Sequence, residues 1–136
     1  MSYLLDTDIC VAIIRKRPAH VLQRLKQQPP GTVGVSSITV GELCTGAAKS
    51  VPPEQNTAAL AQFLLPLEIY AFDYGAAQTY GFVRAELERL GTPIGSMDML
   101  IAAHALSLDL TVVTHNTRHF KKVPGLHLED WFELAS

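Results

Sequence analysis

The chain has 136 residues, 48% of them hydrophobic and 18% charged, and a formal net charge of −2. This composition is typical of a folded globular protein and excludes a disordered or low-complexity chain. The slightly negative charge excludes a polycationic protein that binds nucleic acid through its overall field, so local groups of cations would have to hold any polyanionic partner.

Five short apolar runs favour buried strands, and helical patterns lie between them. In chain order we expect a strand at 3–5, helices at 9–15 and 19–27, a strand at 33–35, helices at 39–49 and 54–64, a strand at 67–72, helices at 74–90 and 96–106, and strands at 110–114 and 126–128. This alternation predicts an α/β fold with a central parallel sheet of four to five strands between two helical layers. No repeat or linker divides the chain, so we expect one domain over residues 1–136.

The sequence also bears on the compartment. No apolar run reaches the roughly 18 to 20 residues that a membrane span needs, and no signal-peptide pattern opens the chain. Cys10 and Cys44 lie in apolar segments outside any Cys or His cluster, and we interpret both as reduced core residues. We therefore expect a cytoplasmic protein with no membrane partner.

Three acidic side chains follow predicted strands in apolar surroundings. Asp6 ends the first strand, Glu42 lies one to two turns into the helix after the second strand, and Asp98 lies in the first turn of the helix that Ser96 is expected to cap. Ligands of open α/β sheets bind beyond the carboxyl ends of the strands. Because a carboxylate beside a core is unfavourable without a partner, and no Lys or Arg adjoins these acids in the sequence, a shared Mg²⁺ or Mn²⁺ would stabilise them.

A purely structural interpretation of the same acids stays open at this point. Asp6 then caps the following helix, Glu42 faces solvent, and Asp98 complements the positive end of its helix. Spacing alone favours neither interpretation.

Four segments in series carry a family resemblance. They are LDTDIC at 5–10, SSITVGEL at 36–43, GSMDMLIAAHA at 95–105 and VTHNTRHF at 113–120. Together they resemble the PIN-domain ribonucleases, and among these the VapC-type toxins of bacterial toxin–antitoxin pairs. The resemblance covers nearly the whole chain in order and length.

This resemblance implies a PIN-like three-layer α/β/α domain and a Mg²⁺- or Mn²⁺-dependent endoribonuclease that cuts RNA, with tRNA as the expected substrate, and inhibits translation. It also implies a homodimer and a VapB-like antitoxin partner, with operator DNA contacted only through that antitoxin. Carried over residue by residue, Asp6 and Asp98 match the metal-binding aspartates of the family. Glu42 matches the acid that completes the cluster, as a ligand through water or as the group that orients the attacking water.

One position departs from the family pattern. Many PIN domains carry a further acid just after the fourth strand, where this chain has Asn116, so a tightly held second metal is in doubt. Asn116 can accept from a metal-bound water or coordinate through its amide oxygen, and we count it with the catalytic residues. Thr7 and Thr114 look like supporting hydroxyls that hydrogen-bond the carboxylates, although strand-end packing explains them equally well.

Cations and histidines follow the same strand. Arg118, Lys121 and Lys122 form a local positive cluster that we expect to contact RNA phosphates, a solvated surface cluster being the alternative. His115 and His119 have the i, i+4 spacing of a transition-metal clamp, but their segment is turn-like and no third ligand is evident.

Two other functions remain as alternatives. The Asp6-Thr7-Asp8 run also resembles the start of haloacid-dehalogenase-type phosphatases, in which the first Asp is a nucleophile. That family expects Thr or Val where this chain has Cys10, and a longer chain. The other alternative is a catalytically weak PIN-like module that acts with an antitoxin on operator DNA. Such a binding module would have no need of the three acids at the crevice.

Overall fold

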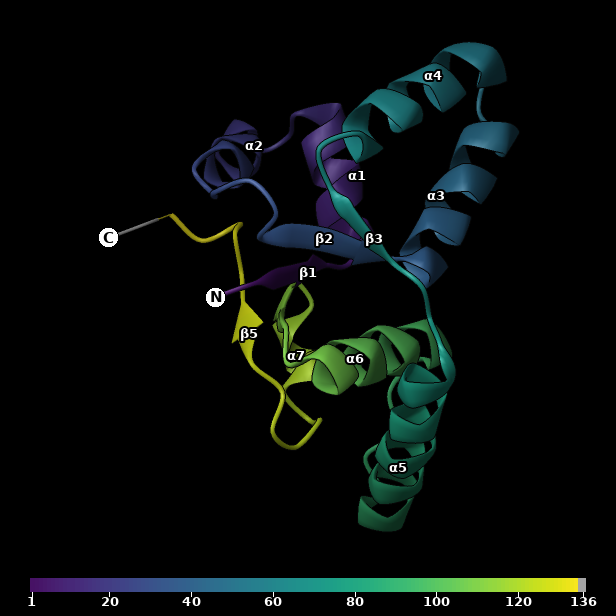
Figure 1. Ribbon diagram of the computed structural model, residues 1–136, viewed down its shortest axis with the longest axis vertical. Coiled ribbons are helices and arrows are strands. Elements are labelled where there is room, and N and C mark those ends of the chain that lie inside the picture. The colour runs from purple at the N-terminus through teal and green to yellow at the C-terminus, as the bar shows by residue number, and fades with distance from the viewer. Residues whose placement is uncertain (135–136) are drawn as a thin grey trace.

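The structure is a computed structural model that describes residues 1–134 of the chain (Figure 1). One parallel sheet crosses the molecule, with its strands in the order β3-β2-β1-β4-β5. The strands are β1 (Tyr3–Leu5), β2 (Val33–Ser36), β3 (Glu68–Tyr70), β4 (Thr111–Val113) and β5 (Leu128–Glu129). Strand β1 is therefore central: β2 and β3 lie on one side of it, and β4 and β5 lie on the other.

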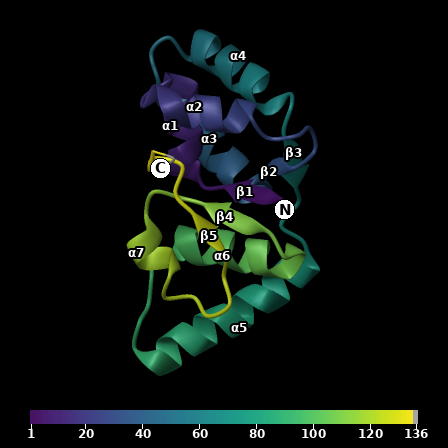
Figure 2. The same cartoon turned by 90° about the vertical axis from the view of Figure 1, so that its left-hand side faces the viewer.

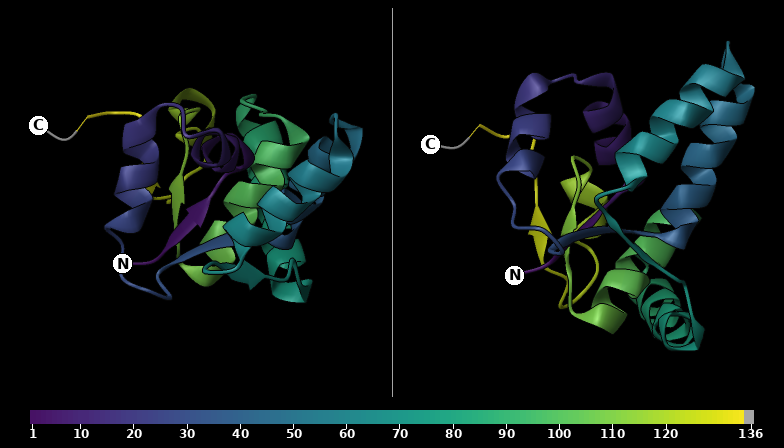
Figure 3. Two further views of the ribbon diagram at one scale, coloured as in Figure 1. Left: turned by 90° about the horizontal axis from the view of Figure 1, so that it is seen from above. Right: turned by 45° about the horizontal axis from the view of Figure 1, so that its top comes forward.

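Helices cover both faces of this sheet (Figure 2). They are α1 (Thr7–Arg15), α2 (Ala19–Lys26), α3 (Ser37–Lys49), α4 (Pro53–Leu64), α5 (Tyr74–Leu90), α6 (Ser96–Leu108) and α7 (Thr117–Phe120). The first four lie on one side of the sheet and the last three on the other. Helices α3 and α4 run side by side and extend away from the sheet (Figure 3).

Alternation along the central strands explains the two layers. Leu4 and Val112 belong to the core that contains α5 and α6, whereas Leu5 and Val113 belong to the core that contains α1 and α2. All four side chains are fully buried. Because successive side chains of a strand point to opposite faces, a strand buried on both faces is continuously apolar. The predicted three-layer α/β fold is confirmed.

Polar residues at the strand ends set the starts of three helices. Asp6 caps α1 and accepts from the Ile9 amide at 2.9 Å, Ser36 caps α3 through the Ile38 amide at 3.1 Å, and Asp73 caps α5. These caps start α1 and α3 two residues before the predicted helices. Helix α6 has Gly95 rather than Ser96 at its N-cap position.

Other sequence expectations were wrong in detail. The strand expected at 67–72 is only three residues long and lies at the sheet edge, where Glu68 and Ile69 are exposed instead of buried. Cys10 is buried, but Cys44 is exposed because it lies on the outer face of α3. Helix α7 was not predicted. None of the helices described is long and apolar enough to cross a membrane.

A close approach between two strands requires glycine. A Cβ built on Gly34 of β2 would lie 2.5 Å from a ring carbon of Tyr70 and 2.7 Å from the carbonyl oxygen of Glu68, both in β3. The Tyr70 ring therefore crosses the backbone of β2, and a larger residue at position 34 would force the two strands apart.

Candidate active site

Five of the residues selected from the sequence meet at the carboxyl edge of the sheet. Asp6 directly follows β1 and Thr114 directly follows β4, and these two strands are neighbours. Glu42 comes from the second turn of α3, Asp98 from the first turn of α6, and Asn116 from the residue before α7. The fold thus brings residues from both halves of the chain to one edge of the sheet.

Asp6 is a buried acid without a cationic partner. Its side chain is only 5% exposed, and no Lys or Arg of residues 1–134 forms an ion pair with it. Burial raises the pKa of Asp6 to about 6, although hydrogen bonds from the Thr114 hydroxyl and the Ile9 amide oppose that rise. The negative charges of Asp8 and Asp98 are smaller contributions to the same rise. Asp6 is therefore ionised at neutral pH only against an unfavourable electrostatic environment.

Asp98 is held by the segment that begins α7. The side-chain amide of Asn116 donates to Oδ2 of Asp98 at 3.1 Å, and Nδ1 of His119 lies 3.5 Å from the same oxygen. His119 Nδ1 also lies 3.0 Å from the Asn116 amide nitrogen. Both of these side-chain contacts of Asn116 involve its amide nitrogen. The amide oxygen has no hydrogen-bond partner in the described part of the chain. The sequence singled out His119 only for its spacing from His115, and its place beside Asp98 was not predicted; the i, i+3 spacing from Asn116 would have indicated it if α7 had been predicted.

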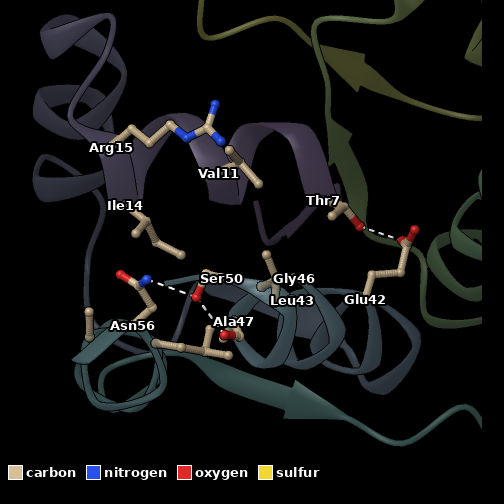
Figure 4. A pocket seen from close by; sticks show the side chains of 12 residues that line it. Thr7, Val11, Ile14, Arg15, Glu42, Leu43, Gly46, Ala47, Ser50 and Asn56 are labelled. Carbon is tan, nitrogen blue, oxygen red and sulfur yellow. Dashed lines mark hydrogen bonds between the residues drawn. The ribbon is translucent and has the colours of Figure 1, made fainter. Parts of the chain in front are cut away.

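Glu42 reaches the same place through Thr7. The Thr7 hydroxyl donates to Oε1 of Glu42 at 2.6 Å (Figure 4). Thr7 is the first residue of α1 and directly follows Asp6, so this hydrogen bond ties the Glu42 carboxylate to the residue after the buried acid. Both supporting hydroxyls, Thr7 and Thr114, therefore contact carboxylates in the structure.

The chemistry of these donors fits a divalent cation. No three His, Cys, Asp or Glu side chains of residues 1–134 are grouped so that they could hold a metal ion, so the structure does not bring Asp6, Glu42 and Asp98 together as a three-acid cluster. However, Asp98 lies close enough for its charge to raise the pKa of Asp6, and Asp6 pairs with no Lys or Arg of these residues. Two such carboxylates suit Mg²⁺ or Mn²⁺, which bind few protein oxygens and keep several waters. The two histidines do not form a clamp, because His115 contacts Asp130 and His119 contacts Asp98.

Positive charge lies beside the acids. Arg118, Lys121 and Lys122 are all exposed and lie on α7 or directly after it. None of the three forms an ion pair within the described residues. Phe120 is fully buried and fixes this segment to the core, so the three cations are presented to solvent from a firmly packed element.

An apolar cavity opens next to Glu42. It has a volume of about 310 Å³ and lies between α1, α3 and α4 (Figure 4). Thr7 and Glu42 line one end, Ser50 and Asn56 line the other, and the guanidinium of Arg15 lies at its rim. No sequence pattern indicates this cavity, because its walls come from three helices whose packing depends on the tertiary fold.

Comparisons with known proteins agree with this geometry. The family model described as PIN domain matches residues 3–126. The chain is 43% identical over 131 residues to the tRNA(fMet)-specific endonuclease VapC of Salmonella typhimurium, which covers 96% of this chain and 98% of that protein. It is equally identical over 132 residues to Ribonuclease VapC2 of Rickettsia felis, which covers 96% of this chain and 98% of that protein.

A solved structure is similar over the same length. The crystal structure of DNA-bound VapBC from Salmonella typhimurium has a chain that superposes with a TM-score of 0.91 at 43% identity, covering 96% of this chain and 98% of that one. These similarities rule out the haloacid-dehalogenase alternative. The chain belongs to the PIN-domain family and, within it, to the VapC ribonuclease toxins of VapBC toxin–antitoxin systems.

Proposed function

We propose that this VapC ribonuclease cuts a tRNA in a reaction that depends on Mg²⁺ or Mn²⁺ and inhibits translation, with residues 1–136 acting as a single PIN-like domain. The observation that carries the proposal is the buried Asp6, which pairs with no Lys or Arg of residues 1–134 and lies within reach of the charge of Asp98, while Glu42 is tied to the neighbouring Thr7. The names of two relatives, each a tRNA(fMet)-specific endonuclease, support tRNA as the substrate class.

Asp6 and Asp98 would hold the cation. When bound there, it would polarise the scissile phosphate and lower the pKa of a coordinated water. The Thr114 hydroxyl and the Ile9 amide keep the Asp6 carboxylate in one orientation. Asn116 does the same for Asp98 through its amide nitrogen.

Glu42 would orient the attacking water. Its carboxylate is fixed by the short hydrogen bond from Thr7, so it can accept a proton from a water placed in line with the phosphorus. The free amide oxygen of Asn116 is a second acceptor for this water. As the water oxygen bonds to phosphorus, the bond to the 3′-oxygen breaks and that oxygen takes a proton from solvent, which leaves a 5′-phosphate and a 3′-hydroxyl. Attack by a 2′-hydroxyl would leave a cyclic phosphate instead.

Arg118, Lys121 and Lys122 would bind the phosphates that flank the cut. They are exposed, form no ion pair within the described residues, and follow Asn116 shortly after it in the sequence. Such contacts release counterions from the RNA and therefore weaken as salt rises.

We also propose the partners and compartment of this toxin. The apolar cavity beside Glu42 would accept a segment of a VapB-like antitoxin, and operator DNA would be contacted only through that antitoxin. The solved relative, a VapBC complex bound to DNA, supports this arrangement. Tyr74 and Phe82 are 78% and 79% exposed on α5, which supports a homodimer through this helix. A tRNA substrate implies the cytoplasm.

One experiment tests the proposed reaction. Purified protein is incubated with total bacterial tRNA in Mg²⁺, in Mn²⁺ and in EDTA, with the Asp98→Asn variant as a matched control. We expect discrete cuts that need the metal, carry 5′-phosphates and disappear in the variant. Intact tRNA in every lane would refute the substrate, and cuts that persist in EDTA or end in cyclic phosphates would refute the mechanism.

A further inference from the structure

The carboxyl edge of the sheet continues beyond the acids to a second cluster. Asp130 directly follows β5, and His115 lies between Thr114 and Asn116 after β4. Nδ1 of His115 lies 3.0 Å from Oδ2 of Asp130. The other carboxylate oxygen of Asp130 accepts from the backbone amide of Phe132 at 2.9 Å. The Asp130 carboxylate therefore orients the imidazole of His115, and the Phe132 amide orients that carboxylate.

An aromatic ring backs this imidazole. The rings of His115 and Phe132 are stacked, with their centroids 4.2 Å apart and their planes within 17° of parallel. One face of the imidazole is thus covered. Even so, the His115 side chain is 61% exposed, whereas the Asp130 side chain is only 11% exposed. The imidazole is therefore stacked on one ring and still largely exposed to solvent.

The cluster is not needed to hold the C-terminal segment. Trp131 is fully buried in the core with α1 and α2, and the Arg24 guanidinium lies over its ring. Nε2 of His20 lies 2.6 Å from the carbonyl oxygen of Phe132. Because these contacts already hold the segment, the ordered and exposed imidazole is available for another role.

The position of His115 suggests that role. Its chain neighbours are Thr114, which donates to Asp6, and Asn116, which donates to Asp98. Consecutive Cα atoms are about 3.8 Å apart, so the backbone of His115 lies between two residues that contact the acids. Proteins bind unpaired RNA by stacking its bases on aromatic side chains, including histidine.

We propose that His115, backed by Phe132 and held by Asp130, stacks an unpaired base of the RNA next to the cleaved bond. The proposal rests on the ribonuclease function and adds a binding subsite to it. The site would take a nucleobase of either kind, because every base has a face that can stack. Its role is to position the RNA, so it affects how tightly the RNA is bound more than how fast bound RNA is cut.

Three variants separate stacking from hydrogen bonding. His115→Ala removes the ring, His115→Phe keeps a ring without the bond to Asp130, and His115→Asn keeps a hydrogen-bonding amide without a ring. The substrate is a synthetic RNA that spans the cut mapped on tRNA, with protein in excess. We expect His115→Ala and His115→Asn to raise the half-saturating protein concentration about 5- to 100-fold at nearly unchanged maximal rate. His115→Phe should return that concentration to the wild-type value. Melting temperatures show whether each variant is folded.

Abasic substitutions in the RNA identify the stacked base. Removing one base beside the cut should weaken wild-type binding as much as His115→Ala does, and should add nothing to that variant. Fully additive effects at every position would overturn the proposal. Wild-type binding by His115→Asn but not by His115→Phe would also overturn it, because the imidazole would then act only through its hydrogen bond with Asp130.

A binding measurement keeps this result separate from failure of the proposed substrate. A fluorescent single-stranded RNA that contains all four bases is titrated with the Asp98→Asn protein, with and without His115→Ala, in EDTA. We expect weaker binding for the double variant even if no tRNA is cut. Equal binding by both proteins would refute the stacking subsite.

Discussion

Asp6 should destabilise the metal-free protein, so Asp6→Asn is expected to melt at a higher temperature than the wild type in EDTA. Asparagine caps helices about as well as aspartate, so the hydrogen bond from Ile9 is kept while the buried charge is lost. The pKa of Asp6 rises from about 3.9 in an unfolded chain to about 6 in the folded one. This difference corresponds to about 3 kcal/mol of lost stability at pH 8.

The effect has a defined pH dependence. Above pH 6 the carboxyl is ionised in both states, so the full destabilisation applies. As the pH falls, the folded protein takes up the proton first, and the penalty shrinks to about half at pH 5 and vanishes below the unfolded pKa. For a chain of this size the variant should melt about 10 °C higher at pH 8 and about 5 °C higher at pH 5.

Thermal unfolding followed by circular dichroism measures this gap, with Glu42→Gln as a control that removes a less buried charge. Mg²⁺ should raise the melting temperature of the wild type and leave Asp6→Asn nearly unchanged, because ligand binding stabilises only the protein that binds. Equal melting temperatures for wild type and Asp6→Asn at pH 8 would refute the electrostatic argument. A gap that widens toward pH 5 would refute its sign.

Three further predictions concern separate parts of the molecule. Glu42→Gln should slow single-turnover cleavage about 100-fold or more while RNA binding in EDTA stays the same, and a change confined to binding would contradict its role toward water. Gly34→Ala should lower the free energy of unfolding by about 1–3 kcal/mol in urea titrations, because its Cβ would meet Tyr70 and the backbone of β3; an unchanged midpoint would show that the strands separate freely. Replacing Arg118, Lys121 and Lys122 by alanine should reduce the slope of log affinity against log salt by about 2, and an unchanged slope would mean that these cations do not touch phosphates.

The sequence predicted the acids but could not choose between their two interpretations, and Asp6 shows why. One carboxylate oxygen caps α1, as the structural interpretation expects. The same group is also buried, feels the charge of Asp98 and pairs with no Lys or Arg of residues 1–134. The two interpretations are compatible, because a carboxylate has two oxygens with separate partners. Local spacing can indicate the cap but not the burial beside Asp98, because Asp98 and Thr114 lie far from Asp6 in the chain.

Other features depended on tertiary packing and so escaped the sequence. His119 joins Asp98 only because α7 forms, and a four-residue helix leaves no periodic pattern. The apolar run that contains Ile69 resembled a buried strand, but it became the exposed edge of the sheet because no further strand pairs with it in the described residues. Longer helices were predicted closely, and α5 has the bounds that its pattern and Gly91 indicated.

The strand order has a consequence for the synthesis of this protein. Asp6 and Glu42 belong to the half of the chain that emerges first from a ribosome, whereas Asp98, Thr114 and Asn116 belong to the half that emerges last. Strand β4 inserts beside β1 only after both are made, pairing Tyr3 with Thr111. A nascent chain therefore carries separated fragments of a nuclease and no crevice. On the proposed mechanism, the topology therefore completes the active site only when synthesis of the chain is nearly finished.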